Sequence, residues 1–115
     1  MHEDGISPSK YLLNLKEKPD AIFAVNDCLG IVAMNEAKKM NLKIPNDISI
    51  IGFDDEPHSS YFVPALSTIW QPVFSIGILS AKILLSRLNS PDAKYNFRRE
   101  VFKSELIIRG SSRKI

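Results

Sequence analysis

Two short apolar runs separated by a helix-like segment constrain the fold of this chain more than any other feature. Residues 21–25 and 48–53 are almost wholly apolar, as expected of strands covered on both faces in a parallel sheet. Between them, Asn26 and Asp27 can cap a helix that reaches about Asn41, with apolar and small residues at helical spacing. The order strand, helix, strand predicts a right-handed parallel crossover and an α/β fold.

Length and composition predict one modest globular domain. The chain has 115 residues, of which 44% are hydrophobic and 24% are charged. No apolar run approaches the roughly 20 residues that span a bilayer, and the amino end lacks the order of a signal peptide. We therefore expect a cytoplasmic protein. Cys28, the single cysteine, cannot form an internal disulfide, and we interpret it as a small helix residue.

The charge balance is too weak to indicate nucleic-acid binding. The formal net charge is +2 and the pI is near 8.7. The basic residues gather late in the chain, where a solvated strand edge explains them at least as well as a phosphate-binding track. The late basic cluster comprises Arg98, Arg99, Lys103, Arg109, Arg113 and Lys114.

The remaining elements are predicted from local signals. Ser7 is a candidate N-cap, and Pro8 suits the first turn of a helix that ends before Pro19. A third strand over residues 66–70 enters Gln71-Pro72, which we interpret as a crossing point. Residues 73–89 form the longest predicted helix, apolar on more than one side and so in need of cover there. A loop at 90–93 and a strand at about 101–108 follow.

Acidic side chains follow both apolar strands. Asp27 comes after the first strand, and Asp54 and Asp55 come directly after the second. Ligands of open parallel sheets bind outside the carboxyl ends of the strands. Asp27 has two competing roles: a helix cap, or an acceptor for the hydroxyl or ring N–H groups of a polar small molecule. The residues alone favour the cap.

Metal and catalytic chemistry have little support. Asp54, Asp55 and Glu56 could hold Mg²⁺, but an acidic turn before a proline is the more ordinary explanation. No phosphate-binding loop or nucleophile motif accompanies the two histidines, His2 and His58. We predict no metal, no cofactor and no catalysis.

The segment after the acidic turn carries two large aromatic residues. Tyr61 and Phe62 stand in an otherwise loop-like stretch. Aromatic anchors are typical of subunit interfaces, although these two could equally plug the base of the domain. The residues alone do not decide between these roles.

Four ordered motifs carry a family resemblance. Residues 18–27, 44–55, 61–69 with the crossing pair 71–72, and 105–111 follow one another at the spacing of one family. The second motif, IPNDISIIGFDD, is the most specific. Over roughly residues 10–112 the chain resembles the effector-sensing module of LacI-type transcriptional regulators.

The resemblance implies a periplasmic-binding-protein-like type 1 fold, a parallel-sheet architecture with two α/β lobes and a ligand cleft between them. It implies that Asp27 binds effector and that Val73 lies at the pocket wall. Residues 1–72 would belong to the second lobe, 73–95 to a helix crossing to the first lobe, and 96–115 to the return strand and tail, with Gln71 and Pro72 at the crossing. The implied dimer interface comprises His58, Ser59, Ser60, Tyr61 and Phe62.

By this resemblance the fold is incomplete in this chain, which looks like the carboxyl-terminal part of a longer regulator. We expect an effector-sensing and dimerisation function, with a sugar favoured over a purine as effector. We expect a homodimer that reaches operator DNA only through a helix-turn-helix absent from this chain, and no membrane partner. One alternative is the solute-binding protein of a sugar transporter. Another is a small flavodoxin-like enzyme or receiver that uses Asp27, Asp54 and Asp55 around Mg²⁺.

Overall fold

The chain divides into two compact units. The computed structural model describes residues 3–89 and 98–113. Unit 1 comprises Met1–Trp70 and Glu105–Ile115, and unit 2 comprises Gln71–Ser104. Unit 1 therefore joins the first part of the sequence to its end, because the tail returns after the segment that forms unit 2.

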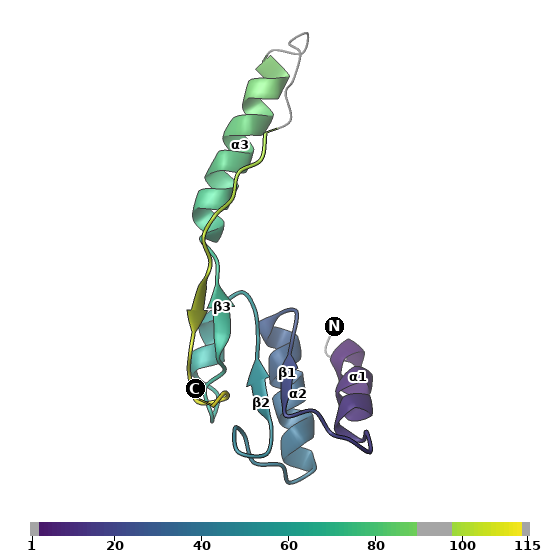
Figure 1. Cartoon of the computed structure of the whole chain (residues 1–115). Coiled ribbons are helices and arrows are strands. Elements are labelled where there is room, and N and C mark those ends of the chain that lie inside the picture. Colours follow the sequence, from purple (N-terminus) through teal and green to yellow (C-terminus); the bar gives the residue numbers. More distant parts are fainter. Residues whose placement is uncertain (1–2, 90–97, 114–115) are drawn as a thin grey trace. The chain divides into compact units, whose positions relative to one another are not determined.

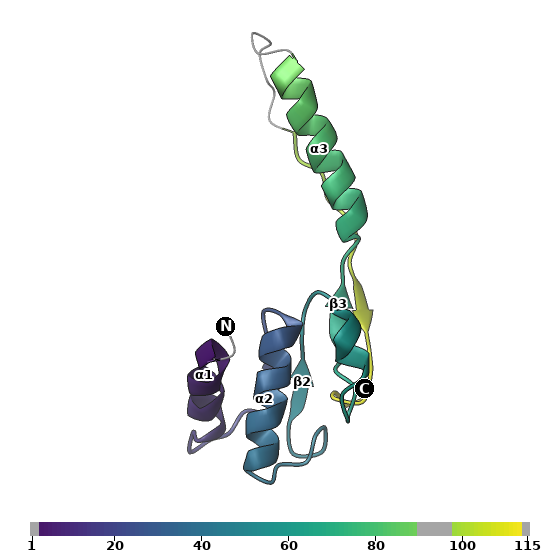
Figure 2. The ribbon, with the colours of Figure 1, turned by 180° about the vertical axis from the view of Figure 1, so that it is seen from behind.

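Unit 1 contains the predicted strand, helix, strand order. Its elements are α1 (Glu3–Leu13), β1 (Ala21–Phe23), α2 (Asp27–Lys39), β2 (Ser49–Ile51), the 3-10 helix η1 (Pro57–Ser60), β3 (Thr68–Trp70) and β4 (Glu105–Ile107). β1 and β2 pair in parallel, with Ile22 opposite Ile50. α2 covers one face of this pair, and α1 lies beside α2 (Figures 1 and 2). The predicted α/β fold with a parallel sheet is confirmed.

Further pairing extends the sheet beyond β2. Ile51 and Ser67 form a parallel bridge, which connects the end of β2 to the residue before β3. β4 then pairs antiparallel with β3. The tail returns to β2 as well, because the Ile50 amide donates to the Ser111 carbonyl (2.8 Å) and the Ser111 hydroxyl donates to the Ile50 carbonyl (2.5 Å). Ser111 is fully buried, so the end of the chain is an integral part of unit 1.

The core of unit 1 lies on the α2 side of the sheet. Its buried members come from α1, α2, β2 and the residues just before β2 and β3, and are Leu13, Ala33, Met34, Ala37, Ile48, Ile50 and Leu66. Phe23 of β1, which alternates with the core-packed Ile22, is 59% exposed on the other side. The prediction that the first strand is covered on both faces is therefore wrong within this chain. Helix α2 covers only one face, so alternate strand residues stay open to solvent.

The element boundaries differ from those predicted. α1 begins at Glu3 rather than at Ser7, and Pro8 lies inside it. The added turn packs closely on α2, because a Cβ on Gly5 would lie 2.7 Å from Leu29 Cδ2. Each strand has three residues, fewer than its apolar run, because only those positions find a continuous partner. The loop predicted at 90–93 lies outside the described residues.

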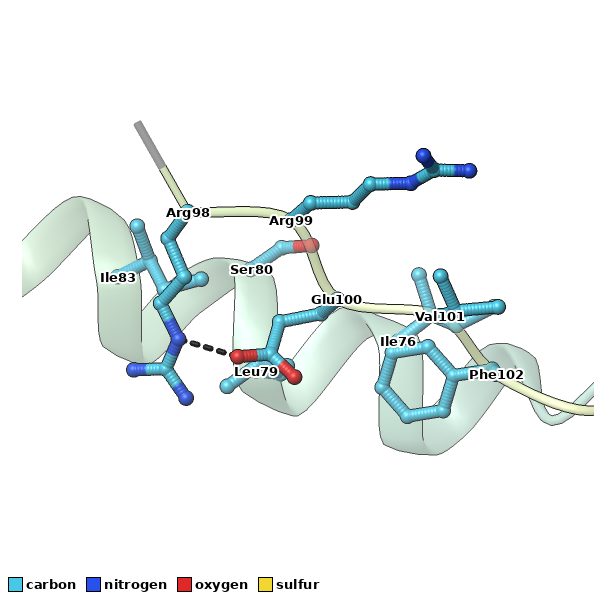
Figure 3. A pocket seen from close by; sticks show the side chains of 9 residues that line it. All are labelled: Ile76, Leu79, Ser80, Ile83, Arg98, Arg99, Glu100, Val101 and Phe102. Atoms are coloured by element: carbon cyan, nitrogen blue, oxygen red, sulfur yellow. Dashed lines mark hydrogen bonds and ion pairs between the residues drawn. The ribbon is translucent and has the colours of Figure 1, made fainter. Parts of the chain in front are cut away.

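Unit 2 is built around α3 (Val73–Asn89), whose bounds match the prediction. None of its residues is buried, and Val73, Phe74 and Leu88 are each more than 60% exposed. A groove of about 490 Å³ separates α3 from the segment 98–102. Figure 3 shows its lining: apolar side chains of the helix, and an Arg98–Glu100 ion pair opposite. Within the described ranges, no helix is both long and apolar enough to cross a membrane.

Candidate functional site

The parallel pairing of β1 and β2 brings two polar loops to one edge. Asn26 and Asp27 follow β1, and residues 53–56 follow β2. The loops are bonded directly, since the Asp27 amide donates to the Phe53 carbonyl (2.9 Å). The edge predicted from the two apolar runs therefore exists, and it is the candidate ligand-binding edge of unit 1.

Asn26, not Asp27, caps α2. Its backbone is extended (φ −154°, ψ 166°), and its Oδ1 accepts a hydrogen bond from the Leu29 amide at 2.9 Å. This is the geometry of an N-cap, in which a side-chain oxygen satisfies an orphan amide of the first turn. Of the two predicted cap residues, Asn26 is confirmed, and the cap role favoured for Asp27 is wrong, because Asp27 already has a helical position and directs its carboxylate elsewhere.

The Asp27 carboxylate is a buried hydrogen-bond hub. The residue is fully buried; Oδ1 accepts from the Thr68 hydroxyl (2.5 Å) and Oδ2 accepts from the Ser59 hydroxyl (2.5 Å) and the Glu56 amide (2.8 Å). Three donors offset the cost of taking a carboxylate out of water. The Asp27 hub thus joins the start of α2 to the loop after β2, to η1 and to β3. Its contact with effector stays a prediction.

The acidic turn after β2 has an unusual backbone. Asp54 and Asp55 have positive φ values of 107° and 53°, a conformation that costs non-glycine residues free energy and persists where neighbours enforce it. The neighbours are identifiable. The Asp54 amide donates to the Ile69 carbonyl (3.0 Å), and the Asp55 amide donates to Thr68 Oγ1 (3.2 Å). The turn leaves Asp54 exposed at the edge of the sheet.

Asp55 turns away from that edge toward the closing strand. Its Oδ1 accepts from Arg109 Nη2 at 2.6 Å, and both side chains are only about one-fifth exposed (22% and 20%). Arg109 also donates to the Leu66 carbonyl at 2.9 Å. Arg109 was assigned to a basic cluster from the sequence, but in the structure it stabilises the acidic turn. Arg113 of the same basic cluster also bonds within the protein, since it donates to the carbonyls of Pro45 and Asn46. Lys114 lies outside the described residues.

The glycine before the turn leaves room for the hub. A Cβ at Gly52 would lie 2.2 Å from Asp27 Oδ1 and 3.1 Å from Asp27 Cα. Both atoms are buried, so the side chain has no free space to move into. The sequence motif Gly52-Phe53-Asp54-Asp55 therefore combines a close approach with a strained turn.

The acidic side chains do not converge on a metal site. Within residues 3–89 and 98–113, no group of three His, Cys, Asp or Glu side chains is placed to hold a metal ion. Asp27 accepts from internal donors, and Asp55 is paired with Arg109. The protein itself thus supplies neutral hydrogen-bond donors to Asp27 and a cationic partner to Asp55.

The predicted interface residues divide between an exposed groove and the interior. A groove of about 450 Å³ is lined by Cys28, Ile31, His58, Tyr61 and Phe62. Tyr61 is 79% exposed, whereas Phe62 packs partly against the core. Phe62 thus has the interior role considered for these two aromatic residues, and an interface role for Tyr61 stays a prediction. Ser59 faces inward to Asp27, and the Ser60 hydroxyl donates to the Pro57 carbonyl (3.1 Å). Cys28 and Ile31 were missed because their partners lie thirty residues later.

Val73 lies in unit 2, at the first position of α3, and is 64% exposed. Gln71 and Pro72 precede it, at the start of unit 2. The role of Val73 as a pocket wall and that of Gln71 and Pro72 as a lobe crossing stay predictions.

Comparison with known proteins assigns this architecture to a family. A model described as periplasmic binding protein-like domain matches residues 3–112. The probable HTH-type transcriptional repressor ExuR of Bacillus subtilis is 40% identical over 113 residues, which are 98% of this chain and 33% of that protein. The repressor CytR of Escherichia coli is 37% identical over 96% of this chain and 32% of its own length.

A solved structure agrees. A LacI family transcriptional regulator from Enterococcus faecium, with bound ribose, is 32% identical and superposes with a TM-score of 0.77 over 96% of this chain and 40% of that one. The chain belongs to the periplasmic binding protein-like domain family, in the branch of the LacI-type regulators. It spans about a third of the length of the curated relatives it matches.

Proposed function

We propose that this chain is the effector-sensing and dimerisation portion of a LacI-type transcriptional regulator that acts in the cytoplasm without catalysis. One observation carries the proposal: a polar edge at the carboxyl ends of β1 and β2, where Asn26 and the buried Asp27 follow β1 and the exposed Asp54 follows β2. The relatives support it, because ExuR and CytR, which are 40% and 37% identical to this chain, are named as transcriptional repressors. The other candidate functions, a solute-binding protein and an Mg-dependent enzyme or receiver, have no comparable support.

The effector is a small polyhydroxylated molecule, with a sugar favoured over a purine. Carboxylate and amide oxygens at this edge accept hydrogen bonds from hydroxyl groups, and charge-assisted bonds of this kind give a site specificity. The regulator from Enterococcus faecium holds ribose, and a relative from Haemophilus influenzae is named as a ribose operon repressor. Ribose is therefore the first probe.

Signal transmission requires a second surface, for which we propose the groove around Tyr61. It is apolar and exposed, and η1, which forms part of it, is bonded through Ser59 to Asp27. A homodimer formed on this face would carry paired DNA-binding heads in a full-length regulator. Effector would act by binding one arrangement of the lobes more tightly than another.

Calorimetric titration of the full-length regulator with ribose, cellobiose and adenine tests the effector proposal. We expect one sugar to bind, and Asp54→Asn to weaken that binding at least tenfold. Asp47→Asn is the matched control, because Asp47 is also an exposed turn aspartate but lies at the amino end of β2. Equal affinities for wild type and Asp54→Asn would contradict the assignment of the edge.

Sedimentation of the same protein tests the dimer face. We expect Tyr61→Arg to convert the dimer to a monomer, because it buries a charge in an apolar interface. Tyr11→Arg, at a tyrosine of α1 that is 69% exposed, is the control and leaves the dimer intact. A dimer that survives Tyr61→Arg would move the interface to another face.

A further inference from the structure

We infer that Asp27 acts on effector binding as a positioning residue, whose buried carboxylate holds the turn 53–56 so that Asp54 is presented at the edge. The inference rests on the proposed function. It differs from direct contact, because a fully buried carboxylate with three internal donors lies behind the surface that an effector meets.

The bonds of Asp27 bracket the turn. Its amide binds the Phe53 carbonyl on the entering side, and its Oδ2 accepts the Glu56 amide on the leaving side. Between these anchors lie the two positive-φ residues, Asp54 and Asp55. A strained backbone segment keeps one conformation only where the surrounding bonds over-determine it. Asp27 supplies both ends of that restraint.

Thr68 extends the restraint to the middle of the turn. The Thr68 hydroxyl donates a hydrogen bond to Asp27 Oδ1. The hydroxyl oxygen, Thr68 Oγ1, also accepts a hydrogen bond from the Asp55 amide at 3.2 Å. Thr68 is fully buried, so its hydroxyl has no route to an effector except through these bonds. A change at Thr68 therefore reports on positioning without removing any group that could touch a ligand.

The test is a double-mutant cycle in the full-length regulator, titrated with ribose. We expect Thr68→Val, which is nearly isosteric, to weaken ribose binding at least fivefold, and Thr68→Ser, which keeps the hydroxyl, to stay within twofold of wild type. In an Asp54→Asn background, Thr68→Val should add less than twofold, because the positioned group is already altered. If Thr68→Val only damaged the fold in general, its fold-loss of ribose affinity would instead be the same in the wild-type and Asp54→Asn backgrounds.

Hydrogen exchange of the peptide covering residues 53–57 gives a reading that needs no ligand. We expect Asp27→Asn and Thr68→Val each to speed exchange there at least tenfold, and Asp47→Asn to leave it within twofold. Unchanged exchange, or unchanged ribose affinity in Thr68→Val while Asp54→Asn loses it, overturns the inference. If wild type binds no probe, the proposed effector function fails, and exchange alone decides whether Asp27 holds the turn. If Asp27→Asn does not fold, the Thr68 pair carries the test.

Discussion

Helices α2 and α3 show that an apolar sequence does not by itself produce burial. α3 is the more apolar of the two, yet none of its residues is buried. α2 carries more charge, yet it buries even Asp27 and Glu36 along with its small residues. The difference lies in the neighbours: α2 has a paired sheet and α1 to pack on, whereas unit 2 offers α3 only the segment after it. Burial of an apolar surface is favourable, but it occurs only where the rest of the fold supplies a surface to pack against.

The largest expected difference between the two units is the cost of truncating an apolar side chain. Ile50→Ala, in the core of unit 1, should lower the free energy of unfolding by about 2–5 kcal/mol, because it leaves a cavity. Leu85→Ala in α3 should cost less than about 0.5 kcal/mol, since Leu85 is 58% exposed. Urea denaturation of the 115-residue chain measures both. Equal costs would show that α3 is buried against something in solution.

Two glycines sharpen the same comparison. Gly52→Ala should destabilise by about 1–3 kcal/mol through overpacking against buried Asp27. Gly77→Ala should stabilise by about 0.5–1 kcal/mol, because nothing beyond the adjacent residues and the nearby backbone of α3 itself lies within 4 Å of the added Cβ, and alanine favours a helix. Thermal unfolding of the two variants checks the opposite signs. A destabilising Gly77→Ala would mean that another surface approaches α3 closely.

The ion pairs of the two units should also differ. Arg109→Ala should cost about 1–3 kcal/mol, because it leaves half-buried Asp55 and the Leu66 carbonyl without a donor. Arg98→Ala should cost at most about 1 kcal/mol, since the Arg98–Glu100 pair is exposed. Denaturation in low and in high salt measures both variants, and only the Arg98 effect should shrink as salt rises. A large, salt-independent Arg98 effect would refute the comparison.

The smallest expected effect on stability belongs to the exposed face of α3. The double change Leu84→Ser and Leu88→Ser should move the free energy of unfolding by less than about 1 kcal/mol but reduce self-association of the 115-residue chain. Light scattering at increasing protein concentration measures association. Tyr11→Ser, on the exposed surface of unit 1, is the control. Unchanged scattering in the double variant would show that this face does not drive association.

The sequence predicted the architecture better than the site. Apolar runs at residues 21–25 and 48–53 predicted the parallel pair, and the long apolar pattern predicted the bounds of α3. The sequence did not decide between Asn26 and Asp27 as the cap of α2, because Asn and Asp are both good caps and local propensity does not rank adjacent positions. The set of interface residues predicted from the sequence lacked Cys28 and Ile31 for another reason. Which loop packs against which face of a helix is decided only when the chain has folded.

What the sequence by itself determined is therefore the order of elements, the family, and the edge at which polar groups follow the strands. These rest on patterns within a few residues, and such local patterns largely determine secondary structure. The tertiary structure alone decided that Asp27 is buried, that Asp55 binds Arg109, and that α3 lacks cover. The partners of Asp27 lie 29, 32 and 41 positions away in the sequence. No local pattern encodes such distant pairings, because packing selects them only when the strands and helices are in place.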